Sequence, residues 1–241
     1  MQKRTDGNIS DSLEEYGGND EALPQYGGGG IGNSDVVNVG MFHPFTAILS
    51  GPTQCGKTNF IFRFIENVEE LVIPQPERIV YCYGEYQPIF AEYPQVEFRE
   101  GLPKCSDFDG RRRTLLIIDD FMNESGTDVS KIFTKGSHHR NISVFFITQN
   151  LFYKSKDSRT MSLNAHYIVA FKNPRDVTQI ATLAKQMYPG STKYMIEAYQ
   201  DATSKPFGYL LIDLKPQTDE RIRLRTNIFP GEVNYVYTKR Y

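Results

Sequence analysis

The sequence predicts an α/β domain with a mostly parallel sheet flanked by helices. A glycine-containing turn at residues 51–58 separates an apolar run from an amphipathic helical pattern, and a second apolar run at 114–118 ends in two aspartates. Apolar runs and helical patterns then alternate along the chain, which is typical of βαβ units. The 241 residues, 39 % of them hydrophobic, suffice for one such domain or for a domain with a tail.

Composition narrows the classes of protein. The net charge of −2 gives no global basic field, so any contact with DNA must come from a local patch, such as one built by several subunits. The chain has three cysteines, Cys55, Cys82 and Cys105, which are far apart in the sequence. Their odd number and wide spacing argue against a disulfide scaffold or a zinc site and are typical of a protein in a reducing compartment. The polar N-terminus and the lack of a run of ~18 apolar residues predict neither a signal segment nor a membrane segment.

Residues 1–40 are predicted to be a flexible, glycine-rich N-terminal tail, followed by a folded domain at 41–241. The tail has few large apolar residues and contains four consecutive glycines at 27–30. Such a segment buries too little surface to offset its ordering entropy. A plain linker is the favoured interpretation, and docking to a partner is the alternative.

The turn at 51–58 matches the pattern of a phosphate loop, and we use that name for it below. A predicted strand at 45–50 enters it, and a predicted helix at 57–68 leaves it. Backbone N–H groups of small residues and the helix N-terminus favour phosphate oxygens, while Lys57 reaches the β- and γ-phosphates and Thr58 can ligate Mg²⁺. We therefore expect ATP to be bound, rather than a plain glycine turn, by Gly51, Pro52, Thr53, Gln54, Cys55, Gly56, Lys57 and Thr58.

The next segment supplies a second strand, predicted at 78–83, and a short one at 96–98. Glu85 follows the second strand at the edge where open α/β sheets bind ligands. The basic triplet at 111–113 is interpreted as a solvated strand entry, with contact to DNA or phosphate as the less favoured alternative.

A third strand is predicted at 114–120, because an unbroken apolar run indicates a strand buried on both faces of a parallel sheet. It ends in Asp119 and Asp120. In phosphate-loop NTPases the first such acid holds Mg²⁺. The second can orient and deprotonate the attacking water, although paired acids after a strand are often only a turn.

Two polar stretches surround the next strand, predicted at 142–147 after a helix at 127–136. Gln149 follows this strand, where an amide could sense the γ-phosphate or position water. His138 and His139 suggest a metal site, but with four histidines in the chain and no cysteine partner, solvated loop residues are favoured.

The last third adds a local basic and aromatic patch at 151–161, including Lys154, Lys156 and Arg159. This patch could bind a nucleic-acid strand, and a solvated loop is an equally good interpretation. Strands are predicted at 166–171, 207–214 and 221–228, the last two around a polar turn, and helices at 173–187 and 191–202.

Three of these stretches, 51–58 (GPTQCGKT), 115–120 (LLIIDD) and 138–150 (HHRNISVFFITQN), resemble the poxvirus-type genome-packaging ATPases. These belong to the FtsK–HerA lineage of DNA-pumping motors, which includes packaging ATPases of Maverick/Polinton-type elements and related viruses. The resemblance extends over residues 42–229. Its most diagnostic feature is the strand end Thr148-Gln149, and FKNPRD at 171–176 also looks like this family.

The resemblance implies a RecA-like core, ATP hydrolysis with Mg²⁺, and a homomeric ring of five or six subunits that threads double-stranded DNA into a capsid. Capsid or portal vertex proteins would be partners. The protein would then act inside the host cell at the site of virion assembly, in the nucleus or cytoplasm. It could also be present in the virion.

By match to the family motifs, Lys57 and Thr58 would bind phosphate and Mg²⁺, and Asp119 would be the metal acid. Asp120 would activate water, although it stands where many members carry the longer glutamate. Gln149 would be the sensor.

Arg140 matches the position of the lineage's arginine finger, which reaches the neighbouring subunit's ATP; an ordinary surface arginine is the alternative. The sequence thus predicts an ATP-driven DNA translocase that packages a genome. The alternatives are a nucleotide or small-molecule kinase on the same loop and a non-enzymatic nucleotide-binding factor in capsid assembly.

Overall fold

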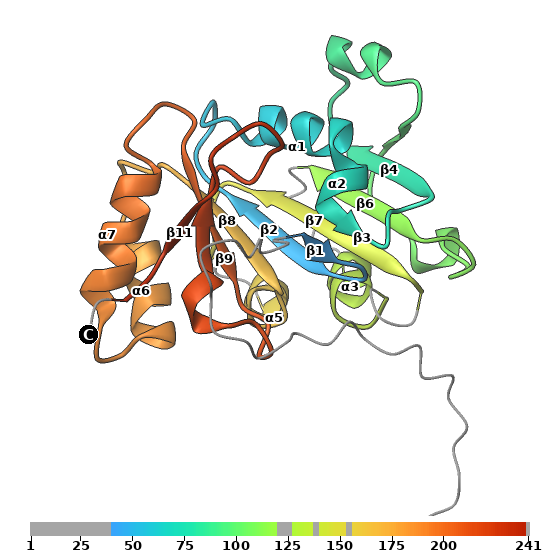
Figure 1. Ribbon diagram of the computed structural model, residues 1–241. Helices are drawn as coiled ribbons and strands as arrows, with labels where there is room; N and C mark the ends of the chain where they lie inside the picture. Colours follow the sequence, from blue (N-terminus) through green and yellow to red (C-terminus); the bar gives the residue numbers. More distant parts are fainter. Residues whose placement is uncertain (1–39, 120–126, 137–139, 153–155, 240–241) are drawn as a thin grey trace, which may run out of the picture. The chain divides into compact units, whose positions relative to one another are not determined.

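The computed structural model describes residues 40–119, 127–136, 140–152 and 156–239 (Figure 1). The predicted N-terminal tail therefore lies outside the described residues, apart from residue 40. So do Asp120, His138, His139 and Lys154.

The described residues form a nine-stranded sheet with the strand order β11-β10-β9-β8-β2-β7-β6-β4-β5. The strand that enters the phosphate loop, β2, lies near the middle of the sheet, between β8 and β7. The bounds are β2 Thr46–Ser50, β4 Arg78–Tyr83, β5 Glu97–Glu100, β6 Thr114–Asp119, β7 Ile142–Thr148, β8 Tyr167–Phe171, β9 Tyr209–Asp213, β10 Leu224–Thr226 and β11 Tyr235–Tyr237.

The sheet is mixed, which corrects the prediction of a mostly parallel one. Strands β8, β2, β7, β6, β4 and β5 run parallel, whereas β9, β10 and β11 each pair antiparallel with their neighbour. For β9, β10 and β11 the physical reason lies in the connections. Segments 214–223 and 227–234 are short enough to join antiparallel neighbours, whereas a parallel pair needs a crossover of a dozen or more residues.

Helices cover both faces of this sheet, so the α/β class is confirmed. One face packs on α1 (Lys57–Glu66), α2 (Val68–Leu71) and the 3₁₀ turn η1 (Pro88–Glu92). The other packs on α3 (Thr127–Lys131), α5 (Lys156–Leu163), α6 (Thr178–Met187) and α7 (Thr192–Ala202). Alternate residues of β2 face opposite cores, since Ile48 belongs to the second and Ala47 and Leu49 to the first.

Several predicted elements differ in detail from those observed. The helix expected at 57–68 is divided into α1 and α2 at Asn67, and the one expected at 127–136 is α3 followed by a π-helical turn, η3 (Ile132–Gly136). Other elements were not predicted at all. Among these are the strand β11, the helix α5 and a separate two-stranded parallel sheet formed by β1 (Met41–Phe42) and β3 (Val72–Ile73).

Parallel pairing brings four strand ends to one edge of the sheet. Ser50 of β2 lies opposite Thr148 of β7, Ile147 of β7 lies opposite Asp119 of β6, and Asp119 lies opposite Tyr83 of β4. The phosphate loop, Asp119 at the end of β6 and Gln149 just after β7 are thereby gathered at the carboxyl edge. This is the edge where open α/β sheets bind ligands.

Candidate functional site

The phosphate loop takes a backbone path that depends on two of its glycines. Gly51 follows β2, and a Cβ there would lie 2.7 Å from both Cys55 Sγ and Phe171 Cβ, so the position has no room for a side chain. Gly56 immediately precedes α1 with φ 105° and ψ 9°, in the left-handed region that glycine tolerates best. From there the helix starts at once, with Phe60 N–H donating to Gly56 O at 2.9 Å.

Lys57 is anchored to its own loop. Its ammonium donates to Gly51 O at 2.6 Å and Pro52 O at 2.8 Å, and Nζ lies 3.9 Å from Cys55 Sγ. Burial raises the pKa of the Cys55 thiol, which keeps that side chain neutral. The loop therefore carries the positive charge of Lys57 without a neighbouring thiolate to offset it.

A cavity of about 610 Å³ opens at the carboxyl edge of the sheet beside the loop. It brings together most of the predicted site residues: Thr53, Gln54, Gly56, Lys57, Thr58, Asp119 and Gln149 all line it. Glu85, which follows β4, lines it as well. Residues distant in sequence therefore face one space that combines the N-terminus of α1, a lysine, two acids and an amide.

Asp119 is held by a tyrosine that sequence reasoning missed. Tyr81 of β4 donates its hydroxyl to Asp119 Oδ2 at 2.6 Å. Burial, followed by the nearby Asp119 charge, raises the pKa of Tyr81, so this hydroxyl stays protonated and remains a donor. The bond fixes one carboxylate oxygen at the end of β6.

The donor set fits a magnesium ion. Mg²⁺ takes oxygen ligands and is usually bound through one or two carboxylates, with substrate phosphates and water completing its shell. The Thr58 hydroxyl and the Asp119 carboxylate line the same cavity. Within the described part of the chain, no three His, Cys, Asp or Glu side chains form a metal-binding group.

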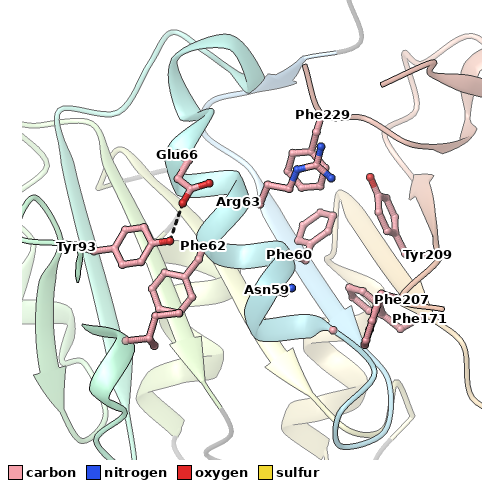
Figure 2. A pocket seen from close by; sticks show the side chains of 12 residues that line it. Asn59, Phe60, Phe62, Arg63, Glu66, Tyr93, Phe171, Phe207, Tyr209 and Phe229 are labelled. Carbon is pink, nitrogen blue, oxygen red and sulfur yellow. Dashed lines mark hydrogen bonds between the residues drawn. The ribbon is translucent and has the colours of Figure 1, made fainter. Parts of the chain in front are cut away.

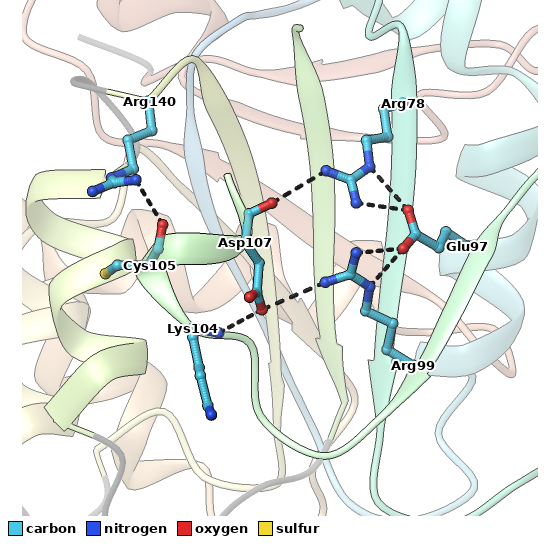
Figure 3. Close-up of polar contacts among 7 residues, drawn as sticks. All are labelled: Arg78, Glu97, Arg99, Lys104, Cys105, Asp107 and Arg140. Atoms are coloured by element: carbon cyan, nitrogen blue, oxygen red, sulfur yellow. Dashed lines mark hydrogen bonds and ion pairs between the residues drawn. The ribbon is translucent and has the colours of Figure 1, made fainter. Parts of the chain in front are cut away.

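Arg140 does not line this cavity. It precedes β7, at the amino end of a strand whose carboxyl end carries Gln149. Its Nη1 donates to Cys105 O at 2.7 Å and Phe108 O at 2.6 Å (Figure 3). Within the chain, Arg140 therefore fixes the segment around the 3₁₀ turn η2 (Cys105–Asp107).

Ion pairs near Arg140 connect two strands of the sheet to the segment around η2. Glu97 accepts from Arg78 at 2.7 Å and also pairs with Arg99, which lies 3.4 Å from Asp107 (Figure 3). These pairs join β4, β5 and η2 into one network of charged side chains.

The basic triplet at 111–113 contacts its own chain. Arg113 donates to Gln75 O at 2.8 Å and pairs with Glu77, while the exposed Arg111 pairs with Asp109. These contacts match the interpretation as a strand entry. In the patch at 151–161, Phe152 packs on the core and Arg159 is exposed.

Comparisons with known proteins give structural neighbours of low similarity. Neither a family model nor a curated protein sequence matches the chain. The DNA-packaging ATPase B204 from Sulfolobus turreted icosahedral virus superposes with a TM-score of 0.48 at 12 % identity, covering 83 % of this chain and 100 % of that one. B204 from Sulfolobus turreted icosahedral virus 2, solved with AMPPCP, gives 0.47 at 14 % identity, covering 73 % and 95 %.

A further neighbour is EccC of Thermomonospora curvata (ATPases 2 and 3), with a TM-score of 0.40 at 11 % identity over 54 % of this chain and 30 % of that one. Similarity at this level does not assign a function. Among the described residues, no helix is long and apolar enough to cross a membrane.

Two more cavity residues were not predicted from the sequence. Asn59 follows the loop's Lys57-Thr58 pair directly, so its position next to the phosphate site was available as a signal. Phe207 comes from the turn before β9, and it reaches the loop only because β9 pairs with β8 beside β2. No local pattern could have indicated that approach.

Proposed function

We propose that this chain is an ATP-hydrolysing DNA translocase that packages a viral or virus-like double-stranded DNA genome into a capsid. The observation that supports hydrolysis is the convergence of Lys57, Thr58, Asp119 and Gln149 on one cavity at the carboxyl edge of parallel strands. The substrate polymer is proposed from the motif resemblance to poxvirus-type packaging ATPases of the FtsK–HerA lineage. The proposal extends to residues 41–241 as the ATPase domain and residues 1–40 as its tail.

The chemistry follows from the charges in the cavity. The loop's N–H groups and the Lys57 ammonium would hold the β- and γ-phosphates, where charge accumulates during transfer. With Mg²⁺ bound, Thr58 and Asp119 would be its protein ligands, and the ion would neutralise charge on the phosphate oxygens. Gln149 would orient a water molecule and Asp120 would accept its proton. Attack by this water on the γ-phosphorus would break the bond to the bridging oxygen and release ADP and phosphate.

The partners follow from the same proposal. A ring of five or six identical subunits would surround double-stranded DNA at a capsid or portal vertex, inside the host cell. The chain's net charge of −2 requires the DNA contacts to be local. The exposed Arg159 lies in the patch best suited to provide one.

ATP turnover with and without duplex DNA, measured alongside the mass of the assembly, tests the proposal. We expect turnover that rises when DNA is added and a mass of five or six subunits. Phosphate transfer to a small acceptor would instead indicate the kinase alternative. ATP binding without turnover, with or without DNA, would indicate the assembly factor.

The second acid of the pair provides a separate prediction. Asp120→Asn is expected to keep ATP bound while lowering turnover about 10²-fold or more, because an amide cannot accept the water's proton and a positioned general base contributes roughly 10²–10⁴-fold. ATP binding and single-turnover hydrolysis measured on the same protein separate the two effects. Glu85→Gln is the matched control, since Glu85 lines the same cavity. Normal hydrolysis by Asp120→Asn and loss in Glu85→Gln would move the base to Glu85.

A further inference from the structure

A second cavity, of about 330 Å³, adjoins the first along the outer face of α1 (Figure 2). The two cavities share Gly56, Asn59 and Phe207, so they meet at the first turn of α1. Seven aromatic residues line the second cavity, which we call the aromatic cavity, together with the polar side chains of Asn59, Arg63 and Glu66. The aromatic residues are Phe60, Phe62, Tyr93, Phe171, Phe207, Tyr209 and Phe229.

Phe207 differs from the other rings of this cavity. Its side chain is 64 % exposed, whereas Phe171 and Phe229 are only 2 % and 3 % exposed. Its φ of 61° lies in the left-handed region, which is costly for a bulky side chain and is concentrated at functional sites. The ring lies against Gly56, where an added Cβ would come within 3.1 Å of it. The fold therefore holds an exposed aromatic ring against the phosphate loop.

The order of groups along the loop gives the direction in which a nucleotide would lie. Asp119, Gln149 and Glu85 line the first cavity only, which assigns the hydrolysed end of the triphosphate to that side. Lys57, Thr58 and Asn59 then lead into the shared boundary at Phe207. The remainder of the nucleotide would pass this boundary into the aromatic cavity.

We propose that the aromatic cavity binds the purine base of the nucleotide, stacked on Phe207. Every base has a π face that stacks on an aromatic side chain, and a purine offers a larger face than a pyrimidine. The Asn59 amide at the boundary carries both a donor and an acceptor for the edge of the base. Farther along the cavity, the Arg63 guanidinium stacks on the Phe229 ring at 4.2 Å and pairs with Glu232, and these contacts hold Arg63 in place. This inference rests on the proposed function, because it takes the first cavity as the triphosphate site.

The test compares ATP, CTP and inorganic tripolyphosphate as ligands of the wild type, Phe207→Ala and Phe207→Leu. Loss of the ring is expected to weaken ATP binding by about 5- to 100-fold, the range found for single base–aromatic stacks. Tripolyphosphate binding should stay within about twofold of wild type, and the preference for ATP over CTP should shrink. Phe207→Leu keeps apolar packing against Gly56 without a π face, so it should show the same selective loss if Phe207→Ala fails to fold.

Tyr235→Ala is the matched control. Tyr235 is 54 % exposed on β11 and lines neither cavity, so its removal should change none of the three affinities. Unchanged ATP binding in both Phe207 variants, with ATP still bound by the wild type, would overturn the base site and leave the proposed ATPase standing. Failure of the wild type to bind either ATP or tripolyphosphate would overturn the proposed function itself.

Discussion

Lys57→Ala is expected to lower ATP turnover by about 10³-fold or more. Lys57 supplies the positive charge within the phosphate loop, and loss of even a neutral donor to a developing oxyanion costs roughly 10²–10³-fold. The fold should survive, because the Lys57 side chain contacts Gly51 O, Pro52 O and Cys55 Sγ of its own loop. Steady-state turnover and the thermal unfolding midpoint of the same preparation provide the two measurements.

Lys193→Ala is the matched control for this change. Lys193 lies on α7, with its side chain 87 % exposed and paired with Glu197, and a surface pair of this kind contributes little to stability. Its turnover and unfolding midpoint should equal those of the wild type. Undiminished turnover in Lys57→Ala would contradict the assignment of residues 51–58 as the catalytic phosphate loop.

The central parallel strands could be predicted closely from the sequence. β4 has the predicted bounds, and β6 differs by one residue, because Asp120 lies outside the described part of the chain. In the sequence, strands buried on both faces appear as unbroken apolar runs that end at polar residues. The same polar ends mark the carboxyl edge, so the grouping of Lys57, Asp119 and Gln149 followed from the strands alone.

Features that depend on distant pairing could not be predicted in this way. β1 and β3 are two residues each and exist because they pair with each other. Tyr81 has the sequence signature of a core residue, and its bond to Asp119 depends on the adjacency of β4 and β6. The approach of Phe207 to Gly56 likewise depends on β9 running antiparallel beside β8.

Arg140 combines one feature that could be predicted from the sequence with another that could not. The sequence places it before β7, and the residue does precede that strand. Its contacts with the carbonyls of Cys105 and Phe108 could not be predicted, because they join segments more than thirty residues apart. A guanidinium has five N–H donors, and these two carbonyls take hydrogens of Nη1. The same side chain can therefore anchor the segment around η2 and present its other nitrogens to a neighbouring subunit.

Arg140→Ala subunits are expected to hydrolyse ATP about 10³–10⁵-fold more slowly than wild type, the value of an arginine finger in other NTPases. The same change should lower the free energy of unfolding by about 1 kcal/mol, because the partly buried carbonyls of Cys105 and Phe108 lose this donor. Arg111→Ala removes an exposed arginine from the same chain and should affect neither quantity. Turnover is therefore measured well below the unfolding midpoint of each variant.

Mixing subunits separates a finger from an anchor. Arg140→Ala subunits keep an intact phosphate loop, and Lys57→Ala subunits keep Arg140. In a mixed ring, some sites would therefore combine the loop of an Arg140→Ala subunit with the Arg140 of a neighbouring Lys57→Ala subunit. In a closed ring of head-to-tail interfaces, an Arg140 that acts as a finger would lie toward the next subunit's ATP. We expect turnover to recover in such mixtures and to rise with protein concentration as rings form. Absence of recovery in mixtures shown by mass to co-assemble, together with loss of stability in Arg140→Ala, would restrict Arg140 to holding Cys105 and Phe108 within its own subunit.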